Sequence, residues 1–230
     1  MIKTIRCAVK AVRVTPMKSI YLVAALSAVA LAAGCANPSR SRDLGNPNVA
    51  AVTLAQQVCS NCHGLTGNAV SPNFPNLAGQ MESYIVAQLS ELKKKDRRDP
   101  AGYEYMWGIS RSLTDDQIKG LASYYASQSP RKQAIEANSS RIAAGKAIFE
   151  AGVPAESVPA CVGCHGDAGQ GMATFPRIAG QHADYIAKQL TVFQRTDERP
   201  EGSVMKVVAH GLTAGDIDNV SAFLQALPNR

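Results

Sequence analysis

The stretch Cys59-Ser60-Asn61-Cys62-His63 occurs a second time, as Cys161-Val162-Gly163-Cys164-His165. In each copy two residues separate the cysteines, and a histidine directly follows the second cysteine. On one turn of helix the two thiols face the same side, so each can form a thioether to one vinyl group of a haem. The adjacent imidazole then lies beneath the porphyrin, where it can bind iron. The repeat predicts two covalent haem c groups, attached through Cys59, Cys62, Cys161 and Cys164, with His63 and His165 as iron ligands.

Other uses of a Cys-x-x-Cys pair fit this chain less well. A zinc site would need two further Cys or His ligands beside each pair, and no other cysteine lies near either copy. A redox dithiol of the thioredoxin type would need a preceding strand in a βαβ unit, which neither copy has. A structural disulfide would not require the histidine that follows. The repeated motif therefore favours haem attachment in both places.

A longer repeat surrounds the two motifs. The segment Phe74-Pro75-Asn76-Leu77-Ala78-Gly79-Gln80 matches Phe175-Pro176-Arg177-Ile178-Ala179-Gly180-Gln181. Apolar residues at helical spacing follow each segment and predict helices that end near residues 95 and 195. Leu-Thr pairs then open a last helix in each half, with capping-box residues at the first turn, at Thr114 to Gln117 and at Thr213 to Asp216. No segment alternates with a period of two, so the predicted fold is all-α, with three or four helices around each haem.

The second axial ligand of each iron has several candidates. The only histidines outside the motifs are His182 and His210, and both lie in the second half, so bis-histidine ligation of both haems is not available. Met106 and Met205 each stand seven residues before a Leu-Thr pair, after charged segments that we expect to be loops. This shared position predicts that both methionines bind iron. The rivals are His210 in the second half and, in less regular positions, Met81 and Met172, with Met81 aligned to His182.

The predicted ligands have a functional consequence. A thioether ligand favours ferrous iron and raises the reduction potential. An iron with six protein and porphyrin ligands has no open position for a substrate. We therefore expect an electron carrier and not an enzyme, with no catalytic residues.

The N-terminal segment has the features of an export signal. Basic residues precede an apolar run from Ile20 to Ala33, as in a signal peptide. The precursor would begin either at Met1 or at Met17. The end of the run resembles a lipobox at Cys35, although Ala32 stands where leucine is usual. Lipidation of Cys35 would attach the protein to a membrane, and ordinary cleavage would leave it unattached; both alternatives stay open. The predicted organisation is a leader (1–36), a flexible arm (37–48), a first haem domain (49–129), a linker (130–139) and a second haem domain (140–230).

The net charge of +6 comes largely from the leader, which holds five basic residues and no acidic ones. The sequence therefore does not indicate nucleic-acid binding. Without the leader, the residues up to 132 carry a formal charge of +3 and those after carry −2. Such a dipole can orient a redox partner during encounter, but scatter of charges on two solvated surfaces is the favoured explanation. No apolar run outside the leader is long enough to span a bilayer.

The chain resembles the dihaem cytochromes c of the cytochrome c4 type, which consist of two class I cytochrome c domains. The resemblance rests on the doubled CxxCHG motif, the paired Phe-Pro-x-[Leu/Ile]-Ala-Gly-Gln segments, the Tyr-x-x-x-Gln-Leu helices and the Met-x₆-Leu-Thr segments, and it covers the chain after the leader. It implies that the carbonyl groups of Pro75 and Pro176 orient the haem-binding histidines. The sequence departs from the family pattern in its aromatic stretch around Met106 and in an insertion at Gly152 to Pro159.

The resemblance also implies a function and a location. We expect a periplasmic carrier of single electrons, with a quinol-oxidising complex or a dehydrogenase as donor and a terminal oxidase as acceptor. One alternative is a haem-bearing electron-transfer subunit that stays docked on a dehydrogenase. A less favoured alternative is a dihaem peroxidase-like enzyme with one open or histidine-bound iron.

Overall fold

The structure is a computed structural model that describes residues 41–100, 102–133, 138–195 and 197–228. Within it, Arg40–Arg230 form one compact unit. The predicted leader at 1–36, which includes Met17 and the predicted lipidation site Cys35, lies outside the described residues. Residues 37–40 of the predicted arm lie outside them too. Among the described residues, no helix is both long and apolar enough to cross a membrane.

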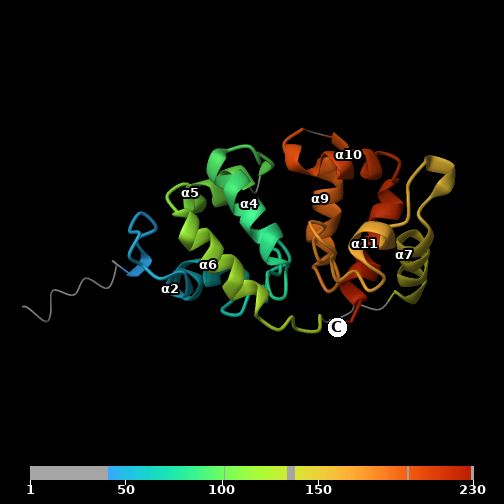
Figure 1. Ribbon diagram of the computed structural model, residues 1–230. Coiled ribbons are helices and arrows are strands. Elements are labelled where there is room, and N and C mark those ends of the chain that lie inside the picture. Colours follow the sequence, from blue (N-terminus) through green and yellow to red (C-terminus); the bar gives the residue numbers. More distant parts are fainter. Residues whose placement is uncertain (1–40, 101, 134–137, 196, 229–230) are drawn as a thin grey trace, which may run out of the picture. The chain divides into compact units, whose positions relative to one another are not determined.

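The first half is built from two long helices and several short ones (Figure 1). The long helices are α4 and α6. The shorter helical segments contain the first motif and Met106. In chain order the elements are α2 (Ala51–Leu54), a π-helical segment (Ala55–Cys59), α3 (Ser60–His63), α4 (Glu82–Lys94), a second π-helical segment (Gly102–Met106), α5 (Trp107–Ser110) and α6 (Asp115–Ala126).

The second half repeats this order with more regular helices (Figure 1). Its elements are α7 (Ser139–Ala151), a 3₁₀ turn (Pro154–Glu156), α8 (Val162–His165), α9 (Ala183–Arg195), a second 3₁₀ turn (Pro200–Gly202), α10 (Ser203–His210) and α11 (Ala214–Ala226). The described residues contain two isolated β-bridges and no strand, so the predicted all-α fold is confirmed. The charged segments that were expected to be loops precede the methionines, and the methionines themselves lie in helical backbone, Met106 in the π-helical segment and Met205 in α10.

The helix ends follow the predicted capping chemistry. Thr114 and Thr213 each accept a hydrogen bond from the backbone N–H three residues on, and the side-chain oxygen at that position, of Gln117 or Asp216, accepts one from the threonine N–H. This arrangement satisfies amide groups that the first turn of a helix leaves without partners. Gln117 also donates to the carbonyl oxygens of Asn46 and Val49, at 3.0 Å each. The end of the predicted flexible arm is therefore attached to the first half.

A glycine lies where the first and last helices of each half cross, but on opposite partners. In the second half it is Gly145 of α7, where an added Cβ would meet the backbone oxygen of Asn219 in α11 at 2.0 Å. In the first half it is Gly120 of α6, where an added Cβ would meet the Cβ of Ala51 in α2 at 2.6 Å. A glycine on either of the two helices lets their backbones approach closely. Both halves therefore have a close helix crossing, although the glycine lies on the first helix in one half and on the last helix in the other.

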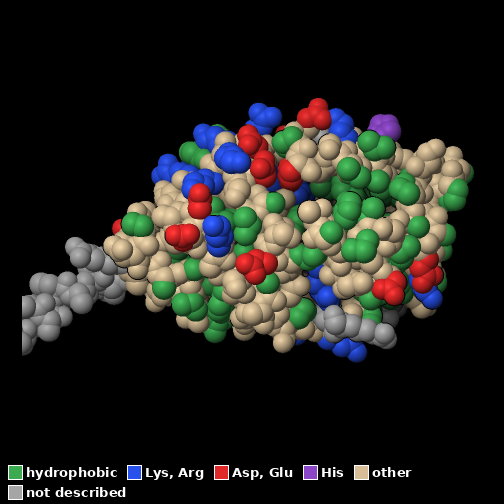
Figure 2. All heavy atoms as spheres, in the orientation of Figure 1, with side chains coloured by type: hydrophobic (Ala, Val, Ile, Leu, Met, Phe, Trp, Pro, Cys, Tyr) green, Lys and Arg blue, Asp and Glu red, His purple; other side chains and the backbone are tan. Residues whose placement is uncertain are grey.

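The surface differs between the halves (Figure 2). Lys and Arg side chains gather over the region of α5, whereas hydrophobic side chains are frequent around α10. Exposed apolar residues of α10 include Val204 and Val207, which are 57% and 77% exposed. The side chains before α5 are instead aromatic, with Tyr103 and Tyr105 48% and 59% exposed. The two methionine-bearing surfaces therefore present different chemistry to a partner.

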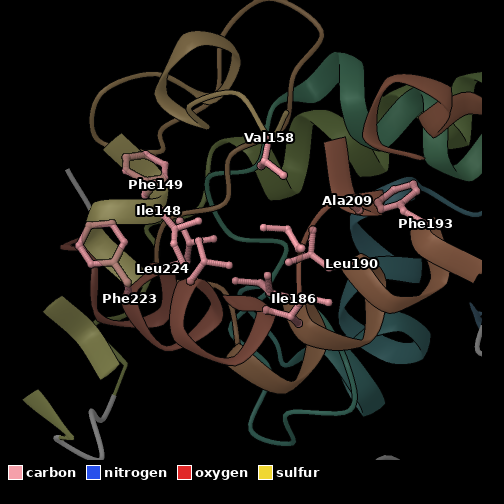
Figure 3. Close-up of a cluster of buried hydrophobic side chains, with 12 residues drawn as sticks. Ile148, Phe149, Val158, Ile186, Leu190, Phe193, Ala209, Phe223 and Leu224 are labelled. Atoms are coloured by element: carbon pink, nitrogen blue, oxygen red, sulfur yellow. The ribbon is translucent and has the colours of Figure 1, made fainter. Parts of the chain in front are cut away.

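Each half has its own hydrophobic core. Residues of the predicted stripes contribute to it, Ile85 and the partly buried Leu89 from α4 and Ile186 and Phe193 from α9. The second core is drawn in Figure 3, where Phe149 of α7 meets Phe223 of α11 with ring centroids 5.4 Å apart. Burial of such apolar surface stabilises each half at about 25 cal/mol per Å². The two motifs lie beside these cores, because Cys59 packs against the first and Cys161 against the second.

Candidate haem-binding sites

The first motif lies on a continuous helical stretch. The chain passes from the π-helical segment ending at Cys59 directly into α3, so both cysteines and His63 share about one turn. Gly64 ends the helix with φ 74°, and a Cβ there would approach the backbone oxygen of Asn68 to 2.4 Å. Only glycine fits this turn, which explains why glycine follows the histidine.

The second motif has the same local geometry with a different approach. α7 ends at Ala151 and is capped by Gly152, and the inserted residues fold back through a bridge between Val153 and Val158 before α8 begins. Gly166 then ends α8 with φ 80°. The insertion changes how the chain reaches the motif but leaves the turn that holds Cys161, Cys164 and His165 intact.

The cysteines are free and partly buried, as haem attachment requires of the unreacted chain. All four thiols at Cys59, Cys62, Cys161 and Cys164 are unpaired. Burial raises the pKa of the Cys59 thiol to about 11, and burial likewise raises that of Cys161 to about 11. The thiols of Cys59 and Cys161 are therefore uncharged before haem is attached, and no cluster of three or more metal-binding side chains is found among the described residues. This donor set fits thioether bonds to a porphyrin better than a thiolate metal site.

Both histidines are oriented by a proline carbonyl, as the resemblance implied. The Nδ1 atom of His63 lies 3.0 Å from the carbonyl oxygen of Pro75, and Nδ1 of His165 lies 2.8 Å from that of Pro176. A carbonyl oxygen only accepts, so Nδ1 carries the proton and the Nε2 lone pair is left to bind iron. Burial lowers the pKa of both histidines despite the proline bond, which favours the neutral form that ligates metal. The two Pro75 and Pro176 contacts are confirmed.

An aromatic ring packs edge-on against each histidine. The ring centroids of Phe74 and His63 are 6.2 Å apart at 68°, and those of Phe175 and His165 are 6.1 Å apart at 70°. The phenylalanine therefore fixes the imidazole plane from the side while the proline fixes its rotation. The repeated Phe-Pro pair found in the sequence is the structural unit that positions the histidine of each motif.

The methionine candidates lie in distinct environments. Met106 ends the π-helical segment before α5, and Met205 lies in α10; both are partly buried, and Met205 packs against the same core as Cys161. Met172 is 48% exposed, and the sulfur of Met81 would contact an added Cβ at Gly171 at 2.7 Å, so Met81 lies against the opposite half.

The remaining histidines also have separate places. The Nε2 atom of His182 lies 3.1 Å from the carbonyl oxygen of Ala69 in the first half. His210 is exposed at the end of α10. Neither arrangement resembles the proline-bonded geometry of His63 and His165.

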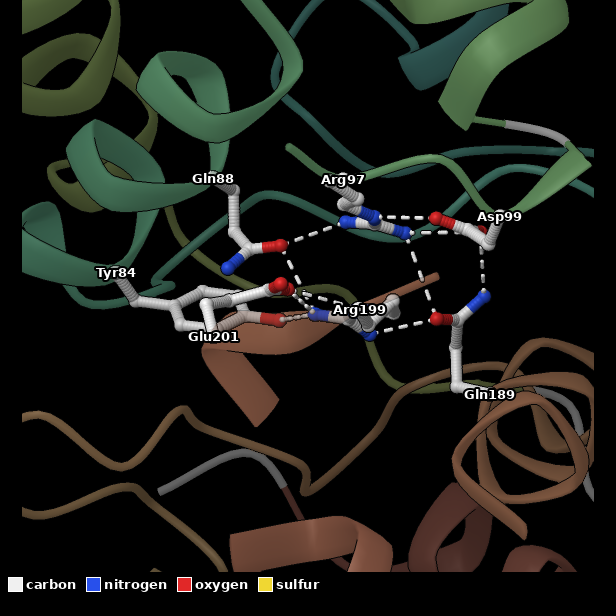
Figure 4. Close-up of polar contacts among 7 residues, drawn as sticks. All are labelled: Tyr84, Gln88, Arg97, Asp99, Gln189, Arg199 and Glu201. Atoms are coloured by element: carbon white, nitrogen blue, oxygen red, sulfur yellow. Dashed lines mark hydrogen bonds and ion pairs between the residues drawn. The ribbon is translucent and has the colours of Figure 1, made fainter. Parts of the chain in front are cut away.

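A buried polar network between the halves was missed by the sequence analysis (Figure 4). Arg97 donates to Asp99 at 2.7 Å and to Gln88 at 2.7 Å in its own half, and to Gln189 of the other half at 3.4 Å. Asp99 is fully buried. Burial opposes ionisation of Asp99, but its bonds to Arg97 and the nearby charges outweigh this effect, so its pKa lies below the ordinary carboxyl value.

Arg199 makes the matching contacts from the second half. It donates to Gln189 at 2.6 Å, to Gln88 across the interface at 2.9 Å, and to Glu201 at 2.9 Å. A further bond reaches the hydroxyl of Tyr84 at 3.3 Å. Gln88 and Gln189 stand at the same offset in the repeat, which was the available signal, whereas Arg97 and Arg199 lie nine and ten residues after them. Sequence alone assigned them to polar helix faces and charged loops because it does not reveal that those faces meet.

Comparison with known proteins agrees with this architecture. The Cytochrome c family model matches residues 49–129 and 142–228. Cytochrome c4 of Pseudomonas aeruginosa is 40% identical over 174 residues, which cover 74% of this chain and 84% of that protein. The cytochrome c4 structure of Acidithiobacillus ferrooxidans superposes with a TM-score of 0.69 at 40% identity, covering 74% of this chain and 98% of the other. A thiosulfate dehydrogenase electron acceptor of Thiomonas intermedia is 29% identical and covers 93% of each chain.

The chain therefore belongs to the cytochrome c family, within its two-domain cytochrome c4 group. It has two covalently bound haem c groups, which the cysteine pairs of the two motifs fit. The cofactor prediction is confirmed, and the assignment of individual iron ligands stays a prediction.

Proposed function

We propose that this protein carries single electrons between redox proteins through two haem c groups, each held by one histidine and one methionine. His63 and Met106 would bind the first iron, and His165 and Met205 the second. Haem c, when bound, supplies an iron that alternates between the ferric and ferrous states. The chain attaches the porphyrin, fixes the axial ligands and limits access of water.

One observation carries the proposal: both motif histidines donate from Nδ1 to a proline carbonyl, at 3.0 and 2.8 Å. The bond presents Nε2 to the iron in a fixed orientation. An imidazole that does not move between oxidation states keeps the reorganisation on electron transfer small. An enzyme with an open iron site would instead need a position from which a ligand can leave.

The methionine assignments are supported by position and burial. Met106 and Met205 occupy equivalent places in the repeat, and both are partly buried, whereas the rival His210 is exposed. A thioether sulfur favours ferrous iron and so raises the reduction potential. Two haems of this type suit a carrier that receives electrons from a donor and passes them to an acceptor of higher potential.

We further propose that the leader at 1–36 directs export to the periplasm, where haem c is attached, and that the haem domains span 49–129 and 140–230. A quinol-oxidising complex or a dehydrogenase would be the donor and a terminal oxidase the acceptor. Lipidation of Cys35 would decide whether the mature protein is tethered to a membrane. Mass spectrometry of protein purified from its own periplasm distinguishes a diacylated N-terminal cysteine from an ordinary cleaved end.

The central test is a spectrum of the exported holoprotein. A pyridine haemochrome assay should give two haems per chain, and the ferric protein should show the far-red charge-transfer band of His/Met ligation at full occupancy of both sites. Fewer than two haems would refute the carrier proposal. A band at half occupancy, or binding of CO by the ferrous protein, would instead support the peroxidase-like alternative with one open iron.

The likeness to a thiosulfate dehydrogenase electron acceptor supports a second candidate function, that of an electron-accepting subunit of a dehydrogenase. The haem sites would work in the same way, but the donor would stay bound. Affinity purification of the tagged chain from its source membrane and periplasm tests this alternative. A stoichiometric dehydrogenase that survives high salt would support a fixed subunit, and a chain recovered alone would support a free carrier.

A further inference from the structure

Two buried glutamines connect the halves at the peptide groups that orient the histidines. Gln181 of the second half accepts a hydrogen bond from the backbone N–H of Asn76 at 2.8 Å and donates to the carbonyl oxygen of Asn76 at 3.0 Å. Gln80 of the first half makes the same pair of bonds with Arg177, at 2.8 and 2.9 Å. Both glutamines are buried, at 7% and 8% exposure.

The residues that the glutamines hold are those directly after the two prolines. The N–H of Asn76 belongs to the same peptide group as the carbonyl of Pro75, which accepts from His63. The N–H of Arg177 likewise shares a peptide group with the carbonyl of Pro176, which accepts from His165. Each histidine is therefore connected through one planar peptide to a glutamine of the opposite half.

The orientation of the glutamine amides follows from their partners. The Oε1 atom of Gln181 also accepts from the N–H of His182 at 3.1 Å, and that of Gln80 accepts from the N–H of Met81 at 3.0 Å. Two N–H donors meet each oxygen and a carbonyl meets each nitrogen, so a flipped amide would lose all three bonds. The chain of bonds is directional: glutamine oxygen to peptide N–H, and peptide oxygen to imidazole N–H.

We propose that Gln181 and Gln80 are positioning residues that each adjust the haem of the opposite half through its histidine. An acceptor on a peptide N–H polarises the group and makes its carbonyl oxygen a stronger acceptor. A stronger bond to Nδ1–H increases electron donation from the imidazole to the iron and favours the ferric state. The proposal rests on the proposed roles of His63 and His165 as iron ligands.

The test uses two crossed variants of the holoprotein, Gln181→Met and Gln80→Met, which keep the approximate side-chain volume and remove the hydrogen bonds. Gln181→Met should raise the ferrous-to-ferric ratio of the first haem by about threefold or more at the wild-type midpoint, with the second haem unchanged. Gln80→Met should do the reverse. The exchange of the imidazole Nδ1 proton with solvent, followed by NMR with labelled histidine, should become faster at His63 in the first variant and at His165 in the second.

A matched control separates this effect from a general loosening of the interface. Gln88→Met removes one bond across the interface and one within the first half from another buried glutamine, but touches neither proline peptide. It should leave both ratios and both exchange rates within about twofold of wild type. The proposal is overturned if each glutamine variant affects the haem of its own half, if both haems shift equally, or if Gln88→Met has the same effect.

The far-red band distinguishes a failure of the proposed iron ligands from a failure of the proposed role of the glutamines. If the wild-type band is absent, the proposed ligands are wrong and the connection has no iron to act on. If the band is present in all variants and the crossed shifts do not appear, the ligands stand and the role of the glutamines is refuted. Restoring an acceptor and a donor with Gln181→His should move the first haem back toward the wild-type ratio.

Discussion

The segment that bears Met106 is one residue longer than the segment that bears Met205, counted from the glycines at 102 and 202. The first half accommodates the extra residue as a π-helical turn over Gly102–Met106, whereas the second half has a 3₁₀ turn followed by the regular helix α10. A single π turn is how helices absorb a one-residue insertion, and such turns are frequent at functional sites. The halves thus keep the positions of the proposed methionine ligands while changing the surface beside them.

The added residue comes with an aromatic cluster in the first half. The rings of Tyr103 and Trp107 are stacked, with centroids 6.2 Å apart at 10°. The ammonium group of Lys95 lies 3.9 Å from the centre of the Trp107 ring, and the guanidinium of Arg111 lies 5.2 Å from it. The second half has exposed valines in the corresponding helix. Equivalent sites with different surroundings can therefore meet different partners.

The second half has its own addition, the insertion after α7. A Cβ at Gly211, just after α10, would meet the backbone oxygen of Glu156 in the insertion at 2.5 Å. Val158 at the end of the insertion is 3% exposed and belongs to the second core. The insertion therefore supports the end of the helix that carries Met205, and the described residues of the first half contain no counterpart of the insertion.

Removing each methionine in turn is the strongest test of whether the two halves have equivalent haem sites. Met106→Ala and Met205→Ala should each abolish about half of the far-red band, because each variant would remove one of two thioether ligands. The affected haem should also become easier to oxidise, since the thioether favours ferrous iron. Optical redox titration of both variants measures the two effects together. An unchanged band in Met205→Ala would redirect the assignment to His210.

The buried arginines should differ in their effect on stability. Arg97→Met leaves Asp99 ionised and fully buried, which should lower the free energy of unfolding by about 3–5 kcal/mol. Arg199→Met should cost less, because the side chain of its partner Glu201 is 18% exposed and can be hydrated. Denaturant unfolding of the two holoproteins gives both values. Equal losses would mean that the carboxylates of Asp99 and Glu201 are equally shielded from water.

The Arg97 effect should also depend on pH. The folded-state pKa of Asp99 lies below its ordinary value, so its ionised form contributes stability above the unfolded pKa, and this contribution is lost as pH falls through the folded pKa. The difference in unfolding free energy between wild type and Arg97→Met should therefore shrink on acidification. Unfolding curves between neutral pH and acid measure it. A difference that grows in acid would exclude Asp99 as the cause.

The two helix crossings predict a smaller asymmetry. Gly145→Ala places a methyl against backbone at 2.0 Å and should destabilise the protein by about 3 kcal/mol, because backbone in a packed helix cannot move aside easily. Gly120→Ala meets only the methyl of Ala51 and should cost about 1 kcal/mol. Thermal unfolding of each holoprotein compares them. The double variant Ala51→Gly with Gly120→Ala should recover most of the stability that Gly120→Ala loses.

The smallest expected effect concerns partner approach. Lys95→Gln should slow reduction of the ferric holoprotein by reduced plant-type ferredoxin, an acidic probe, by about twofold at low ionic strength. The same charge removed at Lys119→Gln, on α6 in the same half, should have less effect if the aromatic cluster is where an acidic partner binds. Stopped-flow rates at several salt concentrations measure both. Equal slowing would show that only the overall charge of the first half matters.

Much of this protein could be predicted from sequence because its chemistry is local. The doubled CxxCH motif, the capping boxes at Thr114 and Thr213, and the apolar stripes depend on residues close together along one helix, so spacing alone determined the haem number, the all-α class and most helix ends. The proline contacts to His63 and His165 also followed, through the family resemblance, from short repeated segments.

Only the tertiary structure decided which polar faces meet. Gln80, Gln88, Gln181 and Gln189 look alike in sequence, as polar positions on or before amphipathic helices. Their roles depend on partners 90 to 111 positions away along the chain. The π turn before α5 was likewise hidden, because a one-residue difference between repeats does not reveal whether a loop or a helix absorbs it. Local spacing sets which groups share a turn, whereas burial and hydrogen bonding between distant segments arise only when the two halves pack together.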